Sequence, residues 1–183
     1  DDNLGFFGLQ YYGTKLGTKN AIHASAMIVE GEFDALANMA YQARAGMQYD
    51  IVLATGGAAE TNLDKLKQFG IQVCLLTPDS PDHNGDVIVK NLLRNNSIPM
   101  HVFTWPDFIA AKDPDEAINT HGGVSWLKAT IARATDGGHR RYYQYAYQWV
   151  IERLHDRLDK VDRDDLRELR KVIIDEGSCL LDP

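Results

Sequence analysis

The chain has 183 residues, 44% of them hydrophobic and 25% charged, which is the composition of an ordinary globular protein with one sizeable core. No apolar run approaches the ~18 residues that a membrane-spanning helix needs, so we expect no membrane partner. The net charge of −7 is uneven, because residues 1–127 carry −7 and residues 128–171 carry +3. A basic tail on an acidic body fits a metal-using enzyme that reaches nucleic acid through its tail, and equally a solvated helical face.

Cysteine usage and the start of the chain give two further expectations. The two cysteines, Cys74 and Cys179, lie far apart in the sequence, and Cys74 lies inside an apolar run. Such cysteines indicate a reducing compartment, so we expect a cytoplasmic protein. The chain opens on DDNLGFF without an initiator methionine, and we therefore expect a piece of a longer protein.

Between residues 25 and 105, apolar runs of strand length alternate with helical patterns. The expected strands are residues 25–30, 50–55, 71–77 and 98–105, and the expected helical segments between them are residues 32–46, 56–70 and 85–96. Because the strands are apolar throughout, they predict a parallel sheet that is covered on both faces. The sequence thus predicts a Rossmann-like α/β fold with about four mainly parallel strands, flanked by helices.

From residue 124 onward the pattern becomes helical. Helices are expected over residues 124–134, 140–161 and 163–175. The second carries Tyr143, Tyr147 and several aliphatic residues at helical spacing, which suits either a packed core or stacking on bases. We expect residues 1–24 to lead in from a preceding domain, residues 25–123 to form the α/β domain, and residues 124–183 to form a helical extension.

Acidic residues and bare backbone gather where the expected strands end. In a parallel sheet these ends lie along one edge, outside which ligands bind. The strand-end residues are Glu30 after the first strand, Thr55 and Gly56 after the second, Asp79 and Asp82, with Asp86 nearby, after the third, and Asp113 and Asp115 after the fourth. Crowded carboxylates repel one another, whereas hard divalent cations such as Mg²⁺ prefer oxygen ligands. The pattern therefore predicts a divalent-cation site at this edge.

Several chemistries are compatible with such a site. Two bound metal ions can activate a hydroxyl group and stabilise a leaving oxygen in phosphodiester chemistry, and Glu30 is placed to shuttle the proton. Gly31 removes a side chain where a substrate would approach. An EF-hand lacks its last acid, because Asn91 stands there, and a phosphoacceptor Asp79 leaves the other motifs unexplained. The aspartates can also be plain turn formers and helix caps.

Four motifs follow one another along the chain: MIVEGEFDAL, LATGGAAE, LLTPDSPDHNGD and KDPDEAI. Together they resemble the TOPRIM domain of bacterial DNA primases and of phage or plasmid primase-helicases. The FGL at residues 7–9 resembles the Y/F-G-L that precedes this domain in primases. The resemblance covers roughly residues 25–120, whereas residues 124–183 resemble the helical subdomain of primases only loosely. Two residues separate Asp79 from Asp82 where the family has one, which leaves open whether Asp82 reaches a metal.

The resemblance implies a nucleotidyltransferase that joins ribonucleotides on a DNA template and so makes primers for DNA replication. It implies that Glu30 is the general base and that Mg²⁺ or Mn²⁺ is bound by aspartates. The implied metal ligands are Asp79, Asp82, Asp113 and Asp115, and the implied supporting residues are Asp34, Gly31, Thr55, Gly56 and Lys112. The implied partners are a single-stranded DNA template, nucleoside triphosphates and a replicative helicase.

Two alternatives to a primase stay open at this point. A TOPRIM nuclease would use the same metals to cut DNA or RNA, and a non-catalytic TOPRIM module would bind DNA or a partner protein. Primer synthesis from nucleoside triphosphates distinguishes a primase from a nuclease. A fragment can also bind metal without making primers when the residues that grip the template lie outside it.

Overall fold

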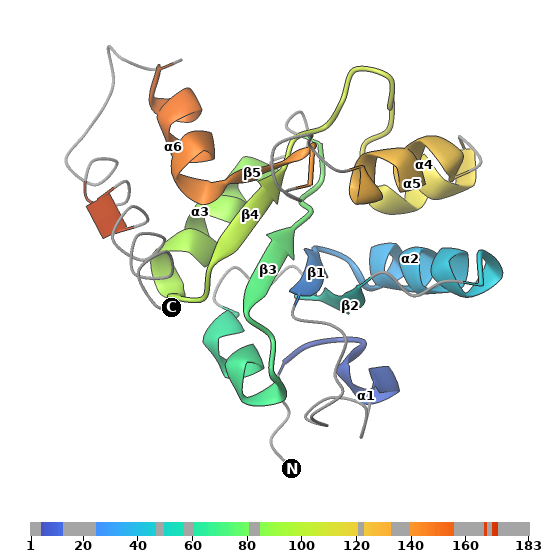
Figure 1. Ribbon diagram of the computed structural model, residues 1–183, viewed down its shortest axis with the longest axis horizontal. Helices are drawn as coiled ribbons and strands as arrows, with labels where there is room; N and C mark the ends of the chain where they lie inside the picture. The colour runs from blue at the N-terminus through green and yellow to red at the C-terminus, as the bar shows by residue number, and fades with distance from the viewer. Residues whose placement is uncertain are drawn as a thin grey trace.

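The computed structural model describes residues 5–12, 25–46, 50–56, 61–80, 85–120, 123–132, 140–155, 167 and 170–171. In chain order the elements are α1 (Leu9–Tyr12), β1 (Ser25–Val29), α2 (Glu32–Arg44), β2 (Ile51–Ala54), the 3-10 helix η2 (Leu63–Phe69), β3 (Val73–Leu76), α3 (Gly85–Asn95), β4 (Met100–Phe103), α4 (Pro114–Thr120), α5 (Val124–Ile131), β5 (Tyr143–Tyr145) and α6 (Ala146–His155) (Figure 1). None of the helices in this part of the chain is long and apolar enough to cross a membrane.

The five strands form one sheet in the order β2-β1-β3-β4-β5. The first four strands in the chain run parallel to one another, and β5 is antiparallel to its neighbour β4. The chain therefore steps from β1 outward to β2 and then crosses back over β1 to form β3. In open α/β sheets, ligands bind outside the carboxyl ends of the strands at such a change of direction. The predicted Rossmann-like α/β fold is confirmed, with five strands where about four were expected.

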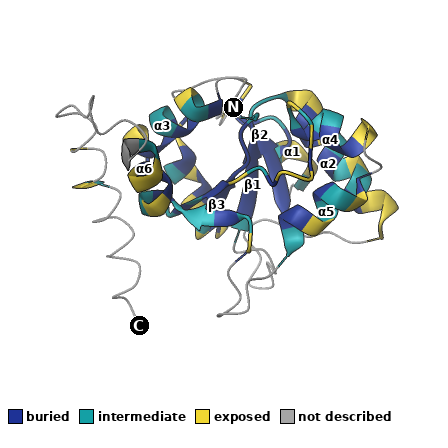
Figure 2. Cartoon of the chain, turned by 90° about the horizontal axis from the view of Figure 1, so that it is seen from above, coloured by how far each residue is buried: buried dark blue, intermediate teal, exposed yellow. Residues whose placement is uncertain are grey.

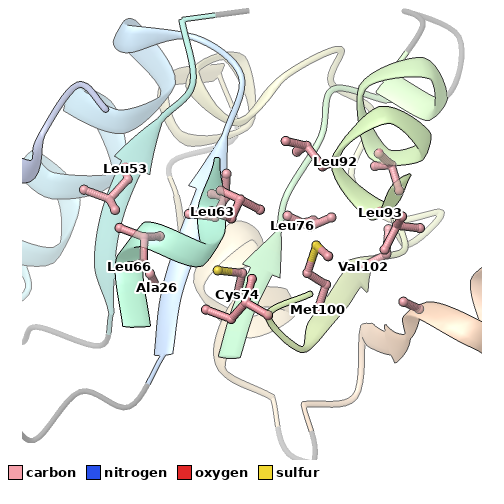
Figure 3. Packing of buried hydrophobic residues seen from close by; sticks show 14 of the residues in the cluster. Ala26, Leu53, Leu63, Leu66, Cys74, Leu76, Leu92, Leu93, Met100 and Val102 are labelled. Carbon is pink, nitrogen blue, oxygen red and sulfur yellow. The ribbon is translucent and has the colours of Figure 1, made fainter. Parts of the chain in front are cut away.

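Alternate residues of the strands pack into layers on the two faces of the sheet. Ala26 and Ile28 of β1 join the larger cluster, with residues of η2, α3 and α6 (Figure 3). Met27 and Val29 join residues of α2 on the opposite face. Parallel crossovers are right-handed, so the reversal of direction after β2 moves the connecting helices from one face to the other. Figure 2 shows the buried strands lying between these two helical layers.

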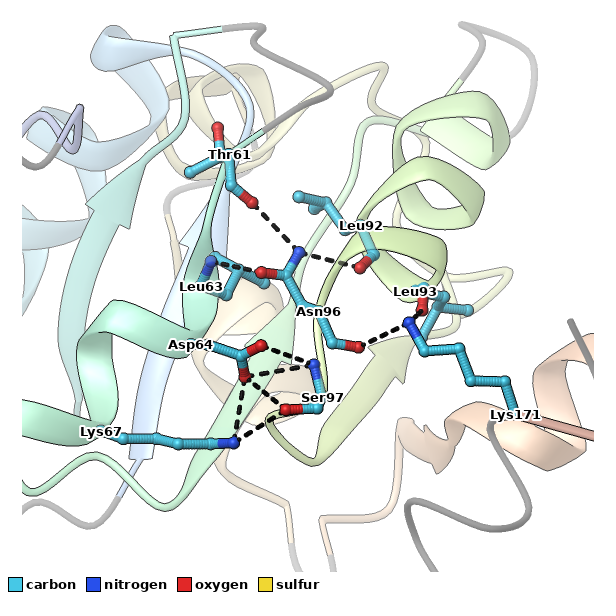
Figure 4. Close-up of polar contacts among 9 residues, drawn as sticks. All are labelled: Thr61, Leu63, Asp64, Lys67, Leu92, Leu93, Asn96, Ser97 and Lys171. Atoms are coloured by element: carbon cyan, nitrogen blue, oxygen red, sulfur yellow. Dashed lines mark hydrogen bonds and ion pairs between the residues drawn. The ribbon is translucent and has the colours of Figure 1, made fainter.

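A buried asparagine joins the end of α3 to the start of η2. The Asn96 Nδ2 donates hydrogen bonds to the carbonyl oxygens of Thr61 (3.0 Å) and Leu92 (2.9 Å), and its Oδ1 accepts one from the Leu63 N–H (Figure 4). The Lys171 ammonium donates to the carbonyls of Leu93 and Arg94 in the last turn of α3 and to that of Asn96, which follows the helix. These carbonyls have no partner within the helix, so a cation there is favourable in both hydrogen bonding and charge.

One helical prediction needs correction. Residues 143–145 were expected inside a long helix, but they form β5, and the helix α6 begins only at Ala146. Tyrosine favours strands, and β4 offers an unpaired edge with which the YQY segment pairs. The helix expected to end at Gly70 is present as the 3-10 helix η2. Most of the helix expected over residues 163–175 lies outside the described residues.

The described residues of α5 and β5, after residue 123, share a core and a sheet with the residues before it. β5 pairs with β4, and Trp126 of α5 packs in one cluster with Phe103 and Tyr143. On the other side of the sheet, the edge of β2 is covered by the beginning of the chain. Phe7 forms an antiparallel bridge with Ala54, with backbone hydrogen bonds of 3.1 and 3.0 Å. The predicted domain boundaries at residues 24 and 123 stay predictions.

A buried ion pair connects β2 with the segment that leads into β5. The Arg140 guanidinium donates two hydrogen bonds of 2.7 Å to the Asp50 carboxylate. It also donates to the Thr130 carbonyl oxygen (3.0 Å), and the Ser25 hydroxyl donates to Asp50 Oδ1 (2.9 Å). Asp50 is only 1% exposed. Because both charges are desolvated, each depends on the other for its burial.

We therefore expect Asp50→Asn and Arg140→Gln each to lower the free energy of unfolding by about 3 kcal/mol or more, because each leaves one buried charge without its partner. The double variant should lose less than the sum of the two, since it leaves neither charge uncompensated. Urea unfolding curves measure this, with Arg141→Gln as an exposed control that should change stability by about 0.5 kcal/mol or less. Additive losses would show that the two side chains do not interact.

Candidate active site

The first two site residues meet between the ends of β1 and β3. Glu30 directly follows β1, and its Oε1 accepts a hydrogen bond of 3.0 Å from the backbone N–H of Asp79. The Thr77 N–H donates to the Ile28 carbonyl (2.8 Å), which continues the pairing of the two strands up to this point. Glu30 and Asp79, two of the residues expected from the sequence, thus lie together at the point where the chain changes direction across the sheet.

Asp34 connects this point to the beginning of α4. Its Oδ2 accepts the N–H of Gly31 (3.1 Å), and its Oδ1 accepts the N–H of Asp115 (3.0 Å). A Cβ atom at Gly31 would stand 2.8 Å from Asp34 Oδ2, so any larger residue there would displace the carboxylate. Gly31 thus leaves room for Asp34, in addition to the access that the sequence suggested. Asp34 is a buried link between two helix starts.

The KDPDE motif builds the start of α4. Asp113 Oδ1 accepts the N–H of Glu116 (2.7 Å), as an N-cap side chain does, and Glu116 Oε2 accepts the N–H of the preceding residue, Lys112 (2.9 Å). Pro114 occupies the first helical position, where a missing N–H has no cost. The Asp115 carboxylate accepts a hydrogen bond from Asn119 Nδ2 (2.6 Å). Helix capping thus accounts locally for Asp113, and a side-chain hydrogen bond within α4 accounts for Asp115. Their roles as metal ligands stay predictions.

The loop that carries Asp79 is fixed by contacts that the sequence did not reveal. The Ser80 N–H donates to the Lys112 carbonyl (2.7 Å), and Trp105 Nε1 donates to the Pro78 carbonyl (3.1 Å). A Cβ atom at Gly85 would overlap the Asp79 carbonyl oxygen, so the beginning of α3 approaches the loop as closely as glycine allows. These hydrogen bonds hold the loop against the residues that follow β4 and against the residues that precede α4.

The carboxylates share one partly buried environment. Burial, followed by the charges of Glu30, Asp34 and Asp113, raises the pKa of Asp79 to about 7. Burial also raises the pKa of Glu30, and the hydrogen bond from Asp79 partly opposes that rise. The pKa of Asp34 is raised by burial and by the charges of Asp113 and Asp115, against the two N–H groups that it accepts. The negative charges of these carboxylates are therefore not fully offset by neighbouring positive charge.

The donor set suits a hard divalent cation. Asp79 Oδ1 is buried and has no hydrogen-bond partner among the described residues, and a cation would supply one. Within the same residues, no three acidic, histidine or cysteine side chains stand close enough to enclose a metal ion by themselves. Asp82 lies outside the described residues. Asp86 faces Arg153, with its Oδ2 2.9 Å from Arg153 Nε, so its charge is already paired.

The end of β2 contributes Thr55 and Gly56. The Thr55 N–H donates to the Val29 carbonyl (3.1 Å), and Thr55 is buried. Thr55 and Glu30 line a cavity of about 10 Å³ between the strand ends and α3, and Thr55 Oγ1 has no hydrogen-bond partner in the described part of the chain. Gly56 has a φ of 64°, a left-handed backbone conformation that favours glycine. Lys112 is exposed, with its Nζ 3.4 Å from Asp113 Oδ2.

The chain is similar in structure to a solved primase. It matches the crystal structure of an Aquifex aeolicus primase that comprises the zinc-binding and RNA polymerase domains, with a TM-score of 0.57 and 20% sequence identity. The match covers 93% of this chain and 36% of that chain. The fold is primase-like. No family model matches the chain, and no curated protein matches it in sequence.

The raised pKa of Asp79 predicts a specific pH dependence of stability. Its folded-state pKa of about 7 exceeds the usual unfolded value of about 4, so between these pH values the folded state holds the proton more tightly. The free energy of unfolding should therefore fall as pH rises through this window. Asp79→Asn should flatten the fall in urea unfolding measured with a chelator present, whereas the exposed control Asp107→Asn should not. A parallel pH profile in Asp79→Asn would remove Asp79 as the cause.

Proposed function

We propose that this chain is the TOPRIM catalytic part of a DNA primase, which joins ribonucleotides on a single-stranded DNA template. The observation that carries the proposal is the Glu30–Asp79 pair at the change of strand direction, with one Asp79 oxygen buried and unpartnered. The primase-like fold over 93% of the chain supports it. Because the chain spans about a third of the matched primase, the activity is proposed for the longer protein of which such a part would be the centre.

In this proposal Mg²⁺ or Mn²⁺ is held by Asp79, with Asp113 and Asp82 as further ligands. When bound, the metal supplies positive charge that neutralises the phosphates and stabilises the leaving oxygen. Asp113 is the carboxylate of α4 whose charge acts on Asp79. Asp34 positions the site by holding the starts of α2 and α4 together. Lys112, exposed beside Asp113, would contact the triphosphate.

Glu30 would accept the proton in the joining step. The 3′-hydroxyl oxygen of the growing primer bonds to the α-phosphorus of the incoming triphosphate, the bond to the β-phosphate breaks, and pyrophosphate leaves. Glu30 Oε1 accepts the Asp79 N–H, so Oε2 is the oxygen that receives the hydroxyl proton. Burial raises the pKa of Glu30 toward neutrality, which makes it a better base than an exposed glutamate.

Glu30→Gln should lower primer synthesis by about 10²-fold or more in the full-length protein, because it keeps the shape of the side chain and removes the base. Binding of single-stranded DNA and the unfolding curve should stay close to wild type. Glu32→Gln, an exposed glutamate two residues along the chain, is the matched control and should keep full activity. Wild-type primer yield in Glu30→Gln would overturn the catalytic assignment, and DNA cleavage without primer synthesis would identify a nuclease instead.

Millimolar Mg²⁺ or Mn²⁺ should raise the melting temperature, because a ligand that binds only the folded state stabilises it. Asp79→Asn should abolish most of this rise, and Asp107→Asn should leave it unchanged. Asp82→Asn tests the altered spacing: a loss equal to that of Asp79→Asn identifies Asp82 as a ligand. Differential scanning fluorimetry with and without a chelator measures all three, and a full metal response in Asp79→Asn would exclude that residue from the ligand set.

A further inference from the structure

An aromatic and cationic surface lies beside the carboxylate edge, where β4 ends and β5 begins. We call it the Phe108 platform, and it consists of Phe108, Tyr142 and Arg141. The Phe108 and Tyr142 rings are 5.8 Å apart and nearly perpendicular, and the Arg141 guanidinium lies 5.5 Å from the centre of the Tyr142 ring. Phe108 is 52% exposed, and Arg141 is exposed as well. A large part of the Phe108 ring and of the Arg141 side chain is thus open to solvent.

The backbone of the platform is anchored by hydrogen bonds and by buried neighbouring residues. The Tyr142 carbonyl accepts a hydrogen bond from the Thr104 N–H (2.7 Å), and the Arg141 N–H donates to the Ala132 carbonyl (2.8 Å). The following residue, Tyr143, is fully buried with its hydroxyl 2.8 Å from Thr77 Oγ1. Ile109, next to Phe108, is in the core. Because these anchors fix the backbone, a ligand that stacks on Phe108 would order little of the protein.

The position of the platform connects it to the acidic site. Phe108 lies on the loop that leads from β4 to α4, which arches beyond the end of β4 toward the helices α4 and α5 in Figure 1. The same loop carries Trp105, bonded to the Pro78 carbonyl, and Lys112, whose carbonyl is bonded to Ser80. Both contacts flank Asp79. A strand lying on the platform can therefore continue toward the carboxylates along a single loop.

We propose that the Phe108 platform binds the single-stranded DNA template, with a base stacked on Phe108 and a phosphate at Arg141. This inference rests on the proposed function for its choice of strand. Bases stack on aromatic side chains irrespective of sequence, and an arginine adds a phosphate contact and a cation–π contribution. Asp107 is exposed beside Phe108, so the local charge nearly cancels. Stacking, more than charge, must then carry the affinity.

This division of roles gives a sharp experiment with the 183-residue chain. Binding of a fluorescein-labelled oligothymidine is measured by anisotropy over a range of salt concentrations, with a chelator and without nucleotides. Phe108→Ala should weaken binding about tenfold or more with an unchanged salt slope, and Phe108→Trp should restore it. Arg141→Gln should lower the log–log salt slope by about 0.7, the value for one phosphate on a single strand. Arg141→Lys should keep the slope, since it keeps the charge.

Tyr11→Ala is the matched control. Tyr11 is 61% exposed and forms a similar edge-to-face pair with Phe7, 6.1 Å between centroids, but at the β2 side of the sheet. The Tyr11→Ala variant should bind DNA with the affinity of the wild type. Wild-type affinity in Phe108→Ala, equal competition by duplex DNA, or no binding by the wild-type chain would each overturn the proposal. The binding assay contains no metal or nucleotide, so a failure of primer synthesis would not affect its result. Conversely, if the protein makes primers but Phe108→Ala binds DNA like the wild type, only the platform proposal fails and the proposed function stands.

Discussion

The hydrogen bond from the Asp79 N–H to Glu30 depends on the chain crossing back over β1 on its way from β2 to β3. That crossing makes neighbours of two strands whose ends would otherwise be separated. The carboxyl ends of the two strands then deliver a glutamate and an aspartate to one place. Asp34 extends the arrangement by accepting N–H groups from the starts of α2 and α4. The topology of the sheet is thus the constraint from which the geometry of the acidic site follows.

The site is built at a cost to stability. Glu30, Asp34 and Asp79 each lose solvation there, and each lies in the negative field of its neighbours. Glu30 and Asp34 recover part of the lost solvation energy by accepting hydrogen bonds from backbone N–H groups. Asp79 Oδ1 has no hydrogen-bond partner among the described residues. A protein selected only for stability would replace such an aspartate with a neutral residue. Local conflicts of this kind are expected where a structure serves a ligand.

The strands and most helices could be predicted because apolar runs and helical spacing are local properties of the sequence. The alignment of Glu30 with Asp79 could be predicted because parallel strands end along one edge. Contacts between distant residues left no such signal: Arg140 and Asp50 are 90 residues apart, and Trp105 and Pro78 are 27 apart. The YQY segment fits a helix and a strand equally well by pattern, and the open edge of β4 decides between them. Asp86 resembled a ligand because the sequence does not show that Arg153 faces it.

The ion pair between Arg140 and Asp50 has a consequence for how the protein is made. Asp50 directly precedes β2, and its countercharge follows 90 residues later in the sequence. A nascent chain that has formed only the first four strands would bury an uncompensated carboxylate and leave one side of β4 without its partner strand. Closing the α/β core before the β5 segment has left the ribosome would therefore cost stability. While the core is open, the emerging chain exposes apolar surface, which is the condition under which chaperones bind.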